Sequence, residues 1–547
     1  MGAQNSVVHG LVQAAGRWDP TIHDHAADTR VGLDALLDTA LSNASTLAGR
    51  QGETGQLRIG ILMPNSLAWL EALITTLAAG SAGVPLPLPS GFGGPQAYMD
   101  HISLLADTAR LDAIIYNAAD LAPTVRALRS RLNGVEFLDI SGWPTARPAS
   151  VTEAADDPRI IQFTSGSTSR PKGVILTAAN ISAAVAILAE HFFLTPTDAL
   201  GNWLPFFHDM GLFMTLAALT HGSSLHLWTP SQAARRPLAW LRQFAENRCT
   251  VAAAPNFFYS QLADAAAKEG TPADLDLSTW RVAINGSETV RADTIERFTR
   301  AFRPAGFHEA AMWPSYGLAE ATLPAAIHRP GLGFTTRAVA RGDLAPGEPV
   351  RFTAVGAPGS RTVVGCGRQL RGTGLRVTDP HGNPLPEAHL GEIQLRSPTV
   401  MAGYLDRPAA EAPVTSEGWL ITGDLGFLSD GELFITGRTK NVAIINGQNV
   451  YAEDLEHLVR DALGDQVRCG VTAGMDEEDR EFILICFEHS GTYEEQSEAV
   501  TLVRNQVSAA LGGFRATVVA LPDRQLPHTT SGKIRRAALA DVAGRYL

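Results

Sequence analysis

Short strand-like runs and longer helix-like runs alternate along most of the chain, and this alternation restricts the fold more than any other feature of the sequence. The runs "LRIGILMP", "LDAIIYN" and "VEFLDI" are rich in branched apolar residues, which are typical of buried strands. The run "GLDALLDTALSNASTLAGR" has apolar residues at helical spacing. Because alternating strands and helices build layers around a sheet, we expect a layered α/β fold in the N-terminal part.

The length of the chain indicates more than one domain. Its 547 residues exceed the roughly 250–300 residues at which a single core stops growing. After Pro398 the sequence changes to short strands and tight turns, with a strong hairpin signal at Asp430-Gly431. The run "NVYAEDLEHLVRDAL" then has helical spacing, and "EFILICFE" is typical of a strand. We expect a large N-terminal α/β domain of several subdomains over residues 1–437, a hinge over 438–440 and a small α+β domain over 441–547.

The composition excludes several classes of protein. With 45% hydrophobic and 18% charged residues, the chain is that of a globular protein with a large core. A net charge of −12 gives no general attraction to nucleic acid or to anionic membranes. Its four cysteines are far apart and form no CxxC pair, so we expect neither a disulfide framework nor a cysteine zinc site, and a cytoplasmic location. The most apolar stretch, "SLAWLEALITTLAAGSAGVPLPLP", contains Glu71 and ends in prolines, which indicates a buried helix followed by a strand.

A loop rich in hydroxyl groups is the first candidate binding element. In "QFTSGSTSRPKGV" the residue Gly166 is flanked by Thr164, Ser165, Ser167 and Thr168. A glycine among hydroxyls lets the backbone approach a ligand and presents N–H and O–H donors together, which suits a chain of phosphates. The loop is not a Walker loop, because its lysine lies between a proline and a glycine. A solvated turn is the alternative interpretation of this stretch taken alone.

Seven segments in a fixed order resemble the motifs of the ATP-dependent adenylate-forming superfamily, which includes acyl-CoA synthetases, adenylation domains, luciferases and fatty acyl-AMP ligases. They are "FTSGSTSRPKG", "WLPFFHDMGL" (203–212), "NGSETV" (285–290), "SYGLAEATL" (315–323), "TGDLG" (422–426), "GRTKN" (437–441) and "LPHTTSGKIRR" (526–536). The resemblance covers most of the chain. It implies a large N-terminal domain and a small mobile C-terminal domain that rotates between two half-reactions, with Lys440 at the hinge.

The resemblance also implies which residues carry the chemistry. In carboxylate adenylation an acid oxygen attacks the α-phosphorus of ATP, so two anions meet and positive charge is needed there. Lys533 would bridge the carboxylate and the α-phosphate, and His208 would lie beside the acyl carboxylate. Glu320 and Thr164 would hold Mg²⁺ against the phosphates, as hard oxygen ligands do. Each of these residues has a structural alternative; for His208, between Phe207 and Asp209, a structural role is as plausible as a catalytic one.

The predicted ATP site combines five segments of the chain. By resemblance, Asp424 would accept hydrogen bonds from both ribose hydroxyls, Arg438 would reach the ribose or the α-phosphate, and Tyr316 would lie against the adenine. The complete predicted set is Thr164, Ser165, Gly166, Ser167, Thr168, Lys172, Gly286, Ser287, Glu288, Ser315, Tyr316, Gly317, Leu318, Ala319, Asp424 and Arg438.

Three features favour the fatty acyl-AMP ligase branch. Common acyl-CoA synthetases carry threonine where this chain has Ala319, and the "ATL" that follows resembles fatty acyl-AMP ligases. From Glu320 to Gly365 there are 365 − 320 = 45 positions, which indicates an insertion over about 327–362. Such an insertion marks fatty acyl-AMP ligases, where it hinders the closure that forms acyl-CoA. Ile444 stands where several relatives that use CoA hold a lysine, and the anionic nucleotide of CoA would lose a cation there.

The sequence therefore predicts an enzyme that joins a medium- or long-chain fatty acid to ATP, releases pyrophosphate and passes the acyl group to the phosphopantetheine thiol of an acyl carrier protein. An acyl-CoA synthetase is the first alternative. A catalytically silent nucleotide-binding scaffold is the second, and the intact Lys533, Glu320, Asp424 and Arg438 argue against it. Thr289 and Asn441 replace a common proline and aspartate, which leaves open a weakened or specialised enzyme. The segment Ala254–Leu262 and Trp313 belong either to an apolar acyl pocket or to the core.

Overall fold

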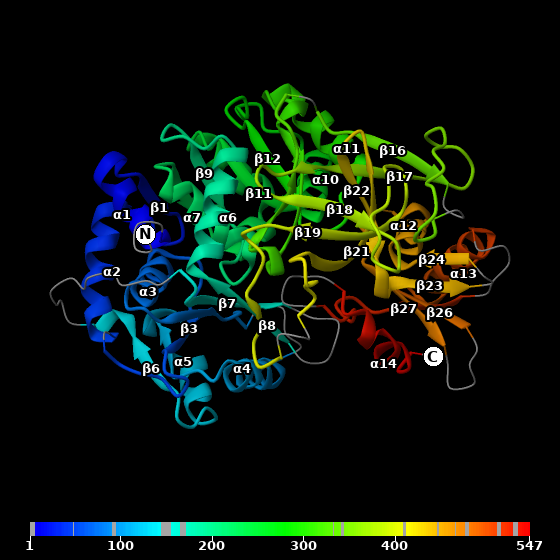
Figure 1. Ribbon diagram of the computed structural model, residues 1–547. Helices are drawn as coiled ribbons and strands as arrows, with labels where there is room; N and C mark the ends of the chain where they lie inside the picture. Colours follow the sequence, from blue (N-terminus) through cyan, green and yellow to red (C-terminus); the bar gives the residue numbers. More distant parts are fainter. Residues whose placement is uncertain are drawn as a thin grey trace.

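The computed structural model describes residues 6–47, 49–89, 94–143, 155–164, 171–331, 333–340, 344–408, 412–445, 448–464, 466–475, 481–510, 516–528 and 534–546. Three large sheets and two small ones are formed within these residues. Figure 1 shows the large sheets and their helices on one side and the C-terminal part, in orange and red, at the other end of the molecule.

The first large sheet contains the strand-like runs of the N-terminal region. Its central strands run parallel to one another. At one edge of the sheet, a two-stranded hairpin and a short strand next to it are paired antiparallel. In sheet order the strands are β20 (Gly403–Tyr404), β8 (Lys172–Thr177), β7 (Pro158–Thr164), β4 (Ala82–Pro85), β3 (Arg58–Leu62), β5 (Ala113–Tyr116) and β6 (Glu136–Asp139). Helices α4 (Pro95–Ala109) and α5 (Ala118–Arg129) belong to this unit.

The second large sheet is parallel except at its β1–β2 edge. Its order is β13 (Met312–Pro314), β12 (Val282–Gly286), β11 (Val251–Pro255), β9 (Ala199–Asn202), β10 (Ser224–Leu227), β1 (Thr21–Asp24) and β2 (Thr29–Gly32). Helices α8 (Pro230–Arg235), α9 (Pro237–Glu246), α10 (Asn256–Glu269) and α11 (Ala292–Phe302) follow its strands.

A shared core joins the first two sheets. Apolar residues of both sheets belong to one buried cluster, together with residues of the helices α1 (Val7–Trp18), α2 (Leu33–Leu47), α3 (Leu67–Ala78), α6 (Ala178–His191) and α7 (Asp209–Thr220). The buried stretch from Leu67 is a helix that leads into β4, as the sequence predicts. The layered α/β interpretation is therefore confirmed for the N-terminal part (Figure 1).

The third large sheet is antiparallel and includes part of the predicted insertion. Its order is β14 (Tyr316–Leu318), β15 (Leu323–Ile327), β17 (Ser360–Gln369), β22 (Glu432–Arg438), β21 (Leu420–Ser429), β19 (Gly391–Arg396) and β18 (Gly374–Thr378), and β16 (Thr336–Ala340) pairs with β17. The turn between β21 and β22 has positive φ at both Asp430 (54°) and Gly431 (70°). These angles are those of a type I′ hairpin turn, which the Asp-Gly pair predicts.

The C-terminal part is a small α+β unit with its own core. It contains β23 (Val442–Ile445), β24 (Gln448–Tyr451), α12 (Ala452–Leu463), β25 (Cys469–Met475), β26 (Glu481–Glu488), α13 (Tyr493–Ala510), β27 (Thr517–Leu521) and α14 (Leu539–Ala543). The α+β class is as expected, although "NVY" belongs to a strand and the helix begins only at Ala452. The limits at 438–440 remain a prediction.

Two expectations from composition concern cysteines and membranes. All four cysteines are free and buried. The sequence predicts no disulfide framework, and the four free thiols agree with that prediction. Among the described residues, none of the helices has the length and apolar content needed to cross a membrane.

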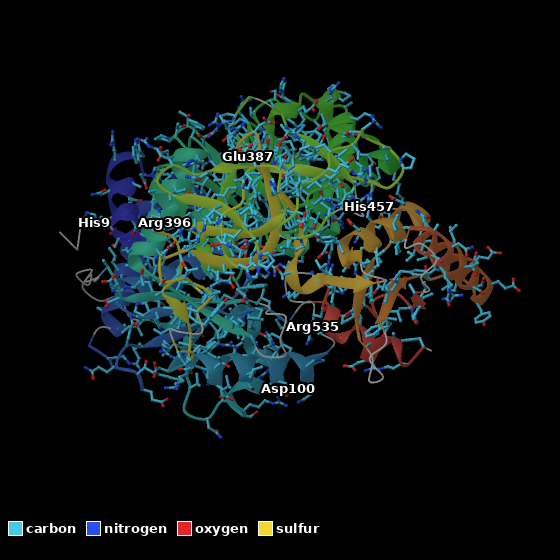
Figure 2. All side chains as sticks on the ribbon, turned by 45° about the vertical axis from the view of Figure 1, so that its right-hand side comes forward. His9, Asp100, Glu387, Arg396, His457 and Arg535 are labelled. Carbon is cyan, nitrogen blue, oxygen red and sulfur yellow. The ribbon has the colours of Figure 1, made fainter. Side chains whose placement is uncertain are left out.

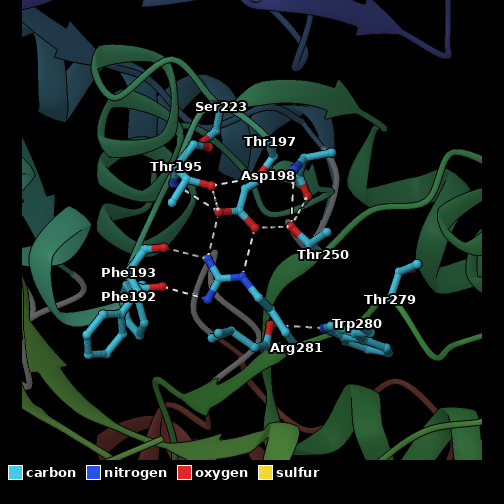
Figure 3. A network of polar contacts seen from close by, with 12 residues as sticks. Phe192, Phe193, Thr195, Thr197, Asp198, Ser223, Thr250, Thr279, Trp280 and Arg281 are labelled. Atoms are coloured by element: carbon cyan, nitrogen blue, oxygen red, sulfur yellow. Dashed lines mark hydrogen bonds and ion pairs between the residues drawn. The ribbon is translucent and has the colours of Figure 1, made fainter.

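An ion pair between a nearly buried aspartate and a partly exposed arginine connects the starts of three parallel strands (Figure 3). Asp198, just before β9, pairs with Arg281, just before β12, through bonds of 2.7 Å to Nε and 2.8 Å to Nη2. Thr250, just before β11, donates a third hydrogen bond to the carboxylate at 2.7 Å. The remaining Arg281 donors reach the carbonyls of Phe192 and Phe193 after α6. Burial works to raise the pKa of Asp198, but the bonds from Arg281 and Thr250 outweigh it, and the pKa is lowered.

The Arg281→Met variant should lower the free energy of unfolding by about 3 kcal/mol, because it leaves a nearly buried carboxylate without its partner. Urea unfolding followed by tryptophan fluorescence measures the loss. Because the folded-state pKa of Asp198 is lowered, its contribution is present above the unfolded pKa of about 3.9 and is lost as pH falls below it. The difference from wild type should therefore shrink in acid.

Arg242→Met is the control, because Arg242 and Asp274 form an exposed pair at 3.3 Å. This variant should change the free energy of unfolding by less than about 0.5 kcal/mol. Equal losses in the two variants would contradict the structural role of the Asp198–Arg281 pair.

Candidate active site

The predicted site residues gather where the three large sheets meet. The carboxyl ends of β7 and β12 contribute Thr164 and Gly286. The third sheet contributes Tyr316 from β14, Asp424 from β21 and Arg438 from β22. Carboxyl ends of strands at such a junction are the usual place for ligands in α/β proteins.

Asp424 is the centre of the polar contacts at this junction. Its side chain is 6% exposed, and Arg438 Nε lies 2.7 Å from Oδ1. The Tyr316 hydroxyl donates to Oδ2 at 2.5 Å. Asp424 and Arg438 are direct partners in the β21–β22 pairing, so the ion pair follows from the register of the hairpin. The arrangement brings together three residues that the sequence assigned to the nucleotide.

The charges of the cluster perturb the groups around Asp424. The Asp424 carboxylate raises the pKa of Arg438, although burial opposes the shift. Burial, followed by the same carboxylate, raises the pKa of Tyr316 well above its usual value. Both neighbours therefore remain protonated and donate hydrogen bonds. Because each carboxylate oxygen accepts two hydrogen bonds, lone pairs on Asp424 remain for ribose hydroxyls.

Glu320 lies in a short 3₁₀ turn, η4 (Ala319–Ala321), between β14 and β15. The Tyr404 hydroxyl donates to its Oε1 at 2.8 Å, and the Lys172 ammonium lies 4.8 Å from the centre of the Tyr404 ring. Burial and the Glu320 carboxylate raise the pKa of Tyr404, which keeps the hydroxyl a donor. Sequence reasoning missed Tyr404, because only the pairing of β20 with β8 brings it to the site.

The hydroxyl-rich loop connects two antiparallel strands. Thr164 ends β7, Lys172 begins β8, and the two are partners in the pairing. Ser165, Gly166, Ser167 and Thr168 lie outside the described residues.

Lys533 also lies outside the described residues, which end at His528 before it and resume at Ile534. His528 and Ile534, on either side, form an isolated antiparallel bridge. Arg535 is close enough to α4 that its charge, after burial, lowers the pKa of His101. Figure 2 shows Arg535 and Asp100, the neighbour of His101, in the same region of the molecule. Arg535, two residues after Lys533, therefore lies near helix α4 of the N-terminal part.

The predicted adenine turn is closely packed around glycines. A Cβ on Gly286 would lie 2.9 Å from the Ser315 carbonyl oxygen, and one on Gly317 would lie 2.0 Å from the Leu323 carbonyl oxygen. Ser287 has a positive φ of 70°. The turn therefore requires glycine where backbones approach. The neighbouring residues Leu318 and Ala319 are buried.

Glu288, which the motif assigns to the ATP site, also makes a contact within the protein. Its carboxylate accepts a hydrogen bond of 2.6 Å from the backbone N–H of Phe257, at the start of α10. A carboxylate at a helix N-terminus is stabilising. Glu288 therefore has a structural contact that joins the adenine turn to α10.

His208 directly precedes helix α7 and lies near the β7–β8 hairpin. Its ring is 4.6 Å from that of Phe207, and the Gln162 side chain of β7 donates to the Phe207 carbonyl. The predicted pocket segment Ala254–Leu262 leads into helix α10. Its residues Phe258, Tyr259 and Leu262 are fully buried in the large core, and so is Trp313. Phe257, by contrast, is 46% exposed. Most of the suggested pocket residues thus belong to the core.

The predicted insertion contacts the start of the C-terminal part. Arg361 Nη1 lies 2.7 Å from Asp454 Oδ1 on α12, and its Nη2 donates to the Thr436 carbonyl at 2.5 Å. The Tyr451 hydroxyl donates to the Leu344 carbonyl at 3.1 Å. Lys440 follows Arg438 by two residues and lies in the 3₁₀ turn η7 (Thr439–Asn441). The side chain of Ile444 lies outside the described residues.

Comparisons with known proteins identify the family. The sequence pattern described as "AMP-binding enzyme" matches residues 14–405. A protein of Caulobacter vibrioides, provisionally named an acyl-CoA synthetase, is 32% identical over 93% of this chain and 90% of its own length. The medium-chain-fatty-acid–[acyl-carrier-protein] ligase JamA of Moorena producens is 31% identical over 87% and 84%.

A solved structure from a study of fatty acyl-adenylate ligases of E. coli and L. pneumophila matches with a TM-score of 0.90 and 28% identity, over 99% of this chain and 98% of that one. The pattern match, the relatives and this structure agree with the order of the seven motifs. The chain belongs to the AMP-binding, adenylate-forming enzymes and is similar to their fatty acyl-AMP ligases.

Proposed function

We propose that this enzyme activates a medium- or long-chain fatty acid with ATP and then transfers the acyl group to the phosphopantetheine thiol of an acyl carrier protein. The observation that carries the proposal is the Asp424 cluster, which places a buried carboxylate, a guanidinium and a tyrosine hydroxyl together at the strand ends. The names of the relatives support fatty acids and a carrier protein as substrates.

In the first half-reaction, a carboxylate oxygen of the fatty acid bonds to the α-phosphorus of ATP while the bond from that phosphorus to pyrophosphate breaks. We assign Asp424 to the ribose hydroxyls and Arg438 to the ribose or α-phosphate, because both lie at the junction with their hydrogen-bonding groups close together. Lys172 and the loop of Thr164, Ser165, Gly166, Ser167 and Thr168 would hold the departing pyrophosphate. Lys533 would supply positive charge where the two anions meet.

Magnesium fits the donor chemistry at Glu320. The carboxylate, held on one oxygen by Tyr404, and the Thr164 hydroxyl are hard oxygen donors of the kind that Mg²⁺ prefers. Bound Mg²⁺ would neutralise charge on the phosphates.

Asp424→Ala should weaken ATP binding about 10-fold to 100-fold, because each lost charge-assisted hydrogen bond is worth roughly 1.5–3 kcal/mol. Titration of ATP and exchange of labelled pyrophosphate into ATP, with a panel of fatty acids, measure the effect. Asp274→Ala, on the exposed surface, is the control. Wild-type affinity in the Asp424 variant would remove Asp424 from the nucleotide site, and no exchange with any acid in the wild-type enzyme would favour the silent scaffold.

The contacts of Arg361 suggest how carrier protein is preferred over CoA. By holding Asp454 and the Thr436 carbonyl, Arg361 fixes the start of α12 to the third sheet. We propose that these contacts restrain the rotation that would close the C-terminal part over CoA. A carrier-protein thiol enters on a flexible arm without the anionic nucleotide.

With both acceptors present, the wild-type enzyme should form acyl-AMP and acylated carrier protein and little acyl-CoA, as mass spectrometry of the products measures. Arg361→Met should raise the acyl-CoA yield several-fold while pyrophosphate exchange stays within about twofold. Arg337→Met is the control, because Arg337 pairs with Asp430 within the third sheet. Efficient acyl-CoA formation by the wild type would instead establish an acyl-CoA synthetase.

Lys440, the proposed hinge residue, lies among other cations. Partial burial of its ammonium group, followed by repulsion from Arg438, lowers its pKa to about 8, and Lys172 and Arg536 contribute to the lowering. The neutral amine is therefore abundant just above neutral pH. An entering triphosphate would oppose the shift, because an anion stabilises the protonated form.

Lys440 should therefore react with an amine-acylating reagent with a midpoint near pH 8, whereas a lysine with a pKa near 10.4 is below about 1% neutral at that pH. Pulse labelling across a pH series, followed by peptide mass spectrometry, measures the profile. Lys268, an exposed residue in the last turn of α10, is the internal control. Saturating ATP should move the Lys440 midpoint upward; the same profile for both lysines, with no effect of ATP, would contradict the proposed cation cluster.

A further inference from the structure

Three histidines lie together at β1 and β10 of the second sheet, and none belongs to the motifs of the active site. His23 on β1 and His226 on β10 are partners in the parallel pairing. His25 follows His23 by two residues, so its side chain projects to the same side of the strand. Segments about two hundred residues apart in sequence are therefore joined by a patch of imidazoles; the bond between His25 and His226 spans 201 positions.

The spacing of the ring nitrogens is close to that of metal ligands. His25 Nε2 and His226 Nδ1 are 3.1 Å apart, and one nitrogen of each of the three histidines lies within 4.8 Å of the other two. In a tetrahedral zinc site with bonds of about 2.0–2.1 Å, neighbouring nitrogens are about 3.3–3.4 Å apart. Two of the three ligands are already close to this spacing, and a shift of up to about 1.4 Å in His23 would complete the set.

Two structural features hold His25 in place. Its ring stacks on Trp228, with centres 4.3 Å apart and an angle of 2° between the planes. The turn after it is fixed by buried Asp24, whose carboxylate accepts hydrogen bonds from the backbone of Ala26, Ala27 and Leu67. Ligands oriented by such neighbours lose little freedom on metal binding.

The charges around the cluster are mixed. Burial, followed by repulsion from neighbouring imidazoles, lowers the pKa of His25 to about 4 and that of His226 to about 3, so both offer neutral nitrogens. Asp28 Oδ1 lies 3.6 Å from His23 Nε2 and is fully exposed, which makes it available as a fourth ligand. Arg30 is a cationic neighbour, and its guanidinium is directed to the Thr21 hydroxyl at 3.1 Å.

We propose that His23, His25 and His226 bind one late first-row transition-metal ion, Zn²⁺ in the first instance, with Asp28 or water as the fourth ligand. Imidazole nitrogens favour Zn²⁺, Co²⁺, Ni²⁺ and Cu²⁺, whereas the oxygen ligands at Glu320 favour Mg²⁺. The two sites therefore differ in chemistry as well as position. A bound ion would cross-link the β1–β2 hairpin, at the edge of the sheet, to β10.

The test uses the full chain without a histidine tag, treated with chelator and then dialysed. Titration with Co²⁺ should give the visible absorption of a four-coordinate ion at one equivalent per chain, and Zn²⁺ should displace it. Calorimetry with Zn²⁺ should give the same stoichiometry. Because the His25 ring stacks on Trp228, Cu²⁺ should quench tryptophan fluorescence, and Trp228→Phe should reduce the quenching without abolishing Zn²⁺ binding.

His226→Gln should lower Zn²⁺ affinity at least 100-fold, and His23→Gln, at a partly exposed side chain on β1, should lower it at least 10-fold. His381→Gln, at an exposed turn, is the matched control and should bind as wild type does. Circular dichroism establishes that each variant is folded; if His226→Gln is not, His23→Gln and His25→Gln decide. Absence of stoichiometric Zn²⁺ binding in the wild type, or binding that survives in the folded histidine variants, overturns the proposal and leaves three packed imidazoles.

Discussion

The buried carboxylate of Asp424 is the constraint on which the organisation of the active site depends. A charge removed from water must be paired, and here it is paired with Arg438 and hydrogen-bonded to Tyr316. These partners come from three strands, so one charge fixes β14, β21 and β22 relative to one another. Because Arg438 ends β22, the same pair fixes the point from which the chain leaves for the C-terminal part.

Contacts between sheets extend this arrangement to the other two. The Tyr404 hydroxyl of the first sheet donates a hydrogen bond to Glu320, which lies next to the third sheet. The Gln162 side chain, also of the first sheet, donates to the Phe207 carbonyl, in the segment between β9 of the second sheet and α7. At the junction the Gly286 and Ser315 backbones approach too closely for a side chain. The site is thus assembled from sheet ends whose mutual positions are set by a few polar bonds, while the shared core of the first two sheets supplies the rigidity.

Sequence reasoning predicted what depends on local pattern. The strand and helix runs, the Asp430-Gly431 turn and the motif residues around Asp424 are found in the structure. Contacts made by distant segments were missed: Tyr404 reaches Glu320 through strand pairing, Glu288 bonds to α10, and the three histidines meet across β1 and β10. Side-chain partners of this kind depend on topology, which single-sequence patterns do not contain. The motif role of Lys533 is untested for a different reason, because it lies outside the described residues.

The electrostatics of the proposed site would allow a chain with a net charge of −12 to attract an anionic nucleotide. Lys172, Arg438 and Arg536 all act on Lys440 and lower its pKa, so these cations repel one another before any ligand arrives. A polyphosphate that entered among them would relieve this repulsion. This decrease in repulsion would favour binding, and the repulsion would return when pyrophosphate leaves. Lys440 lies in the connection to the C-terminal part. The departure of the pyrophosphate charges would therefore act on the segment about which the C-terminal part would turn between the two half-reactions.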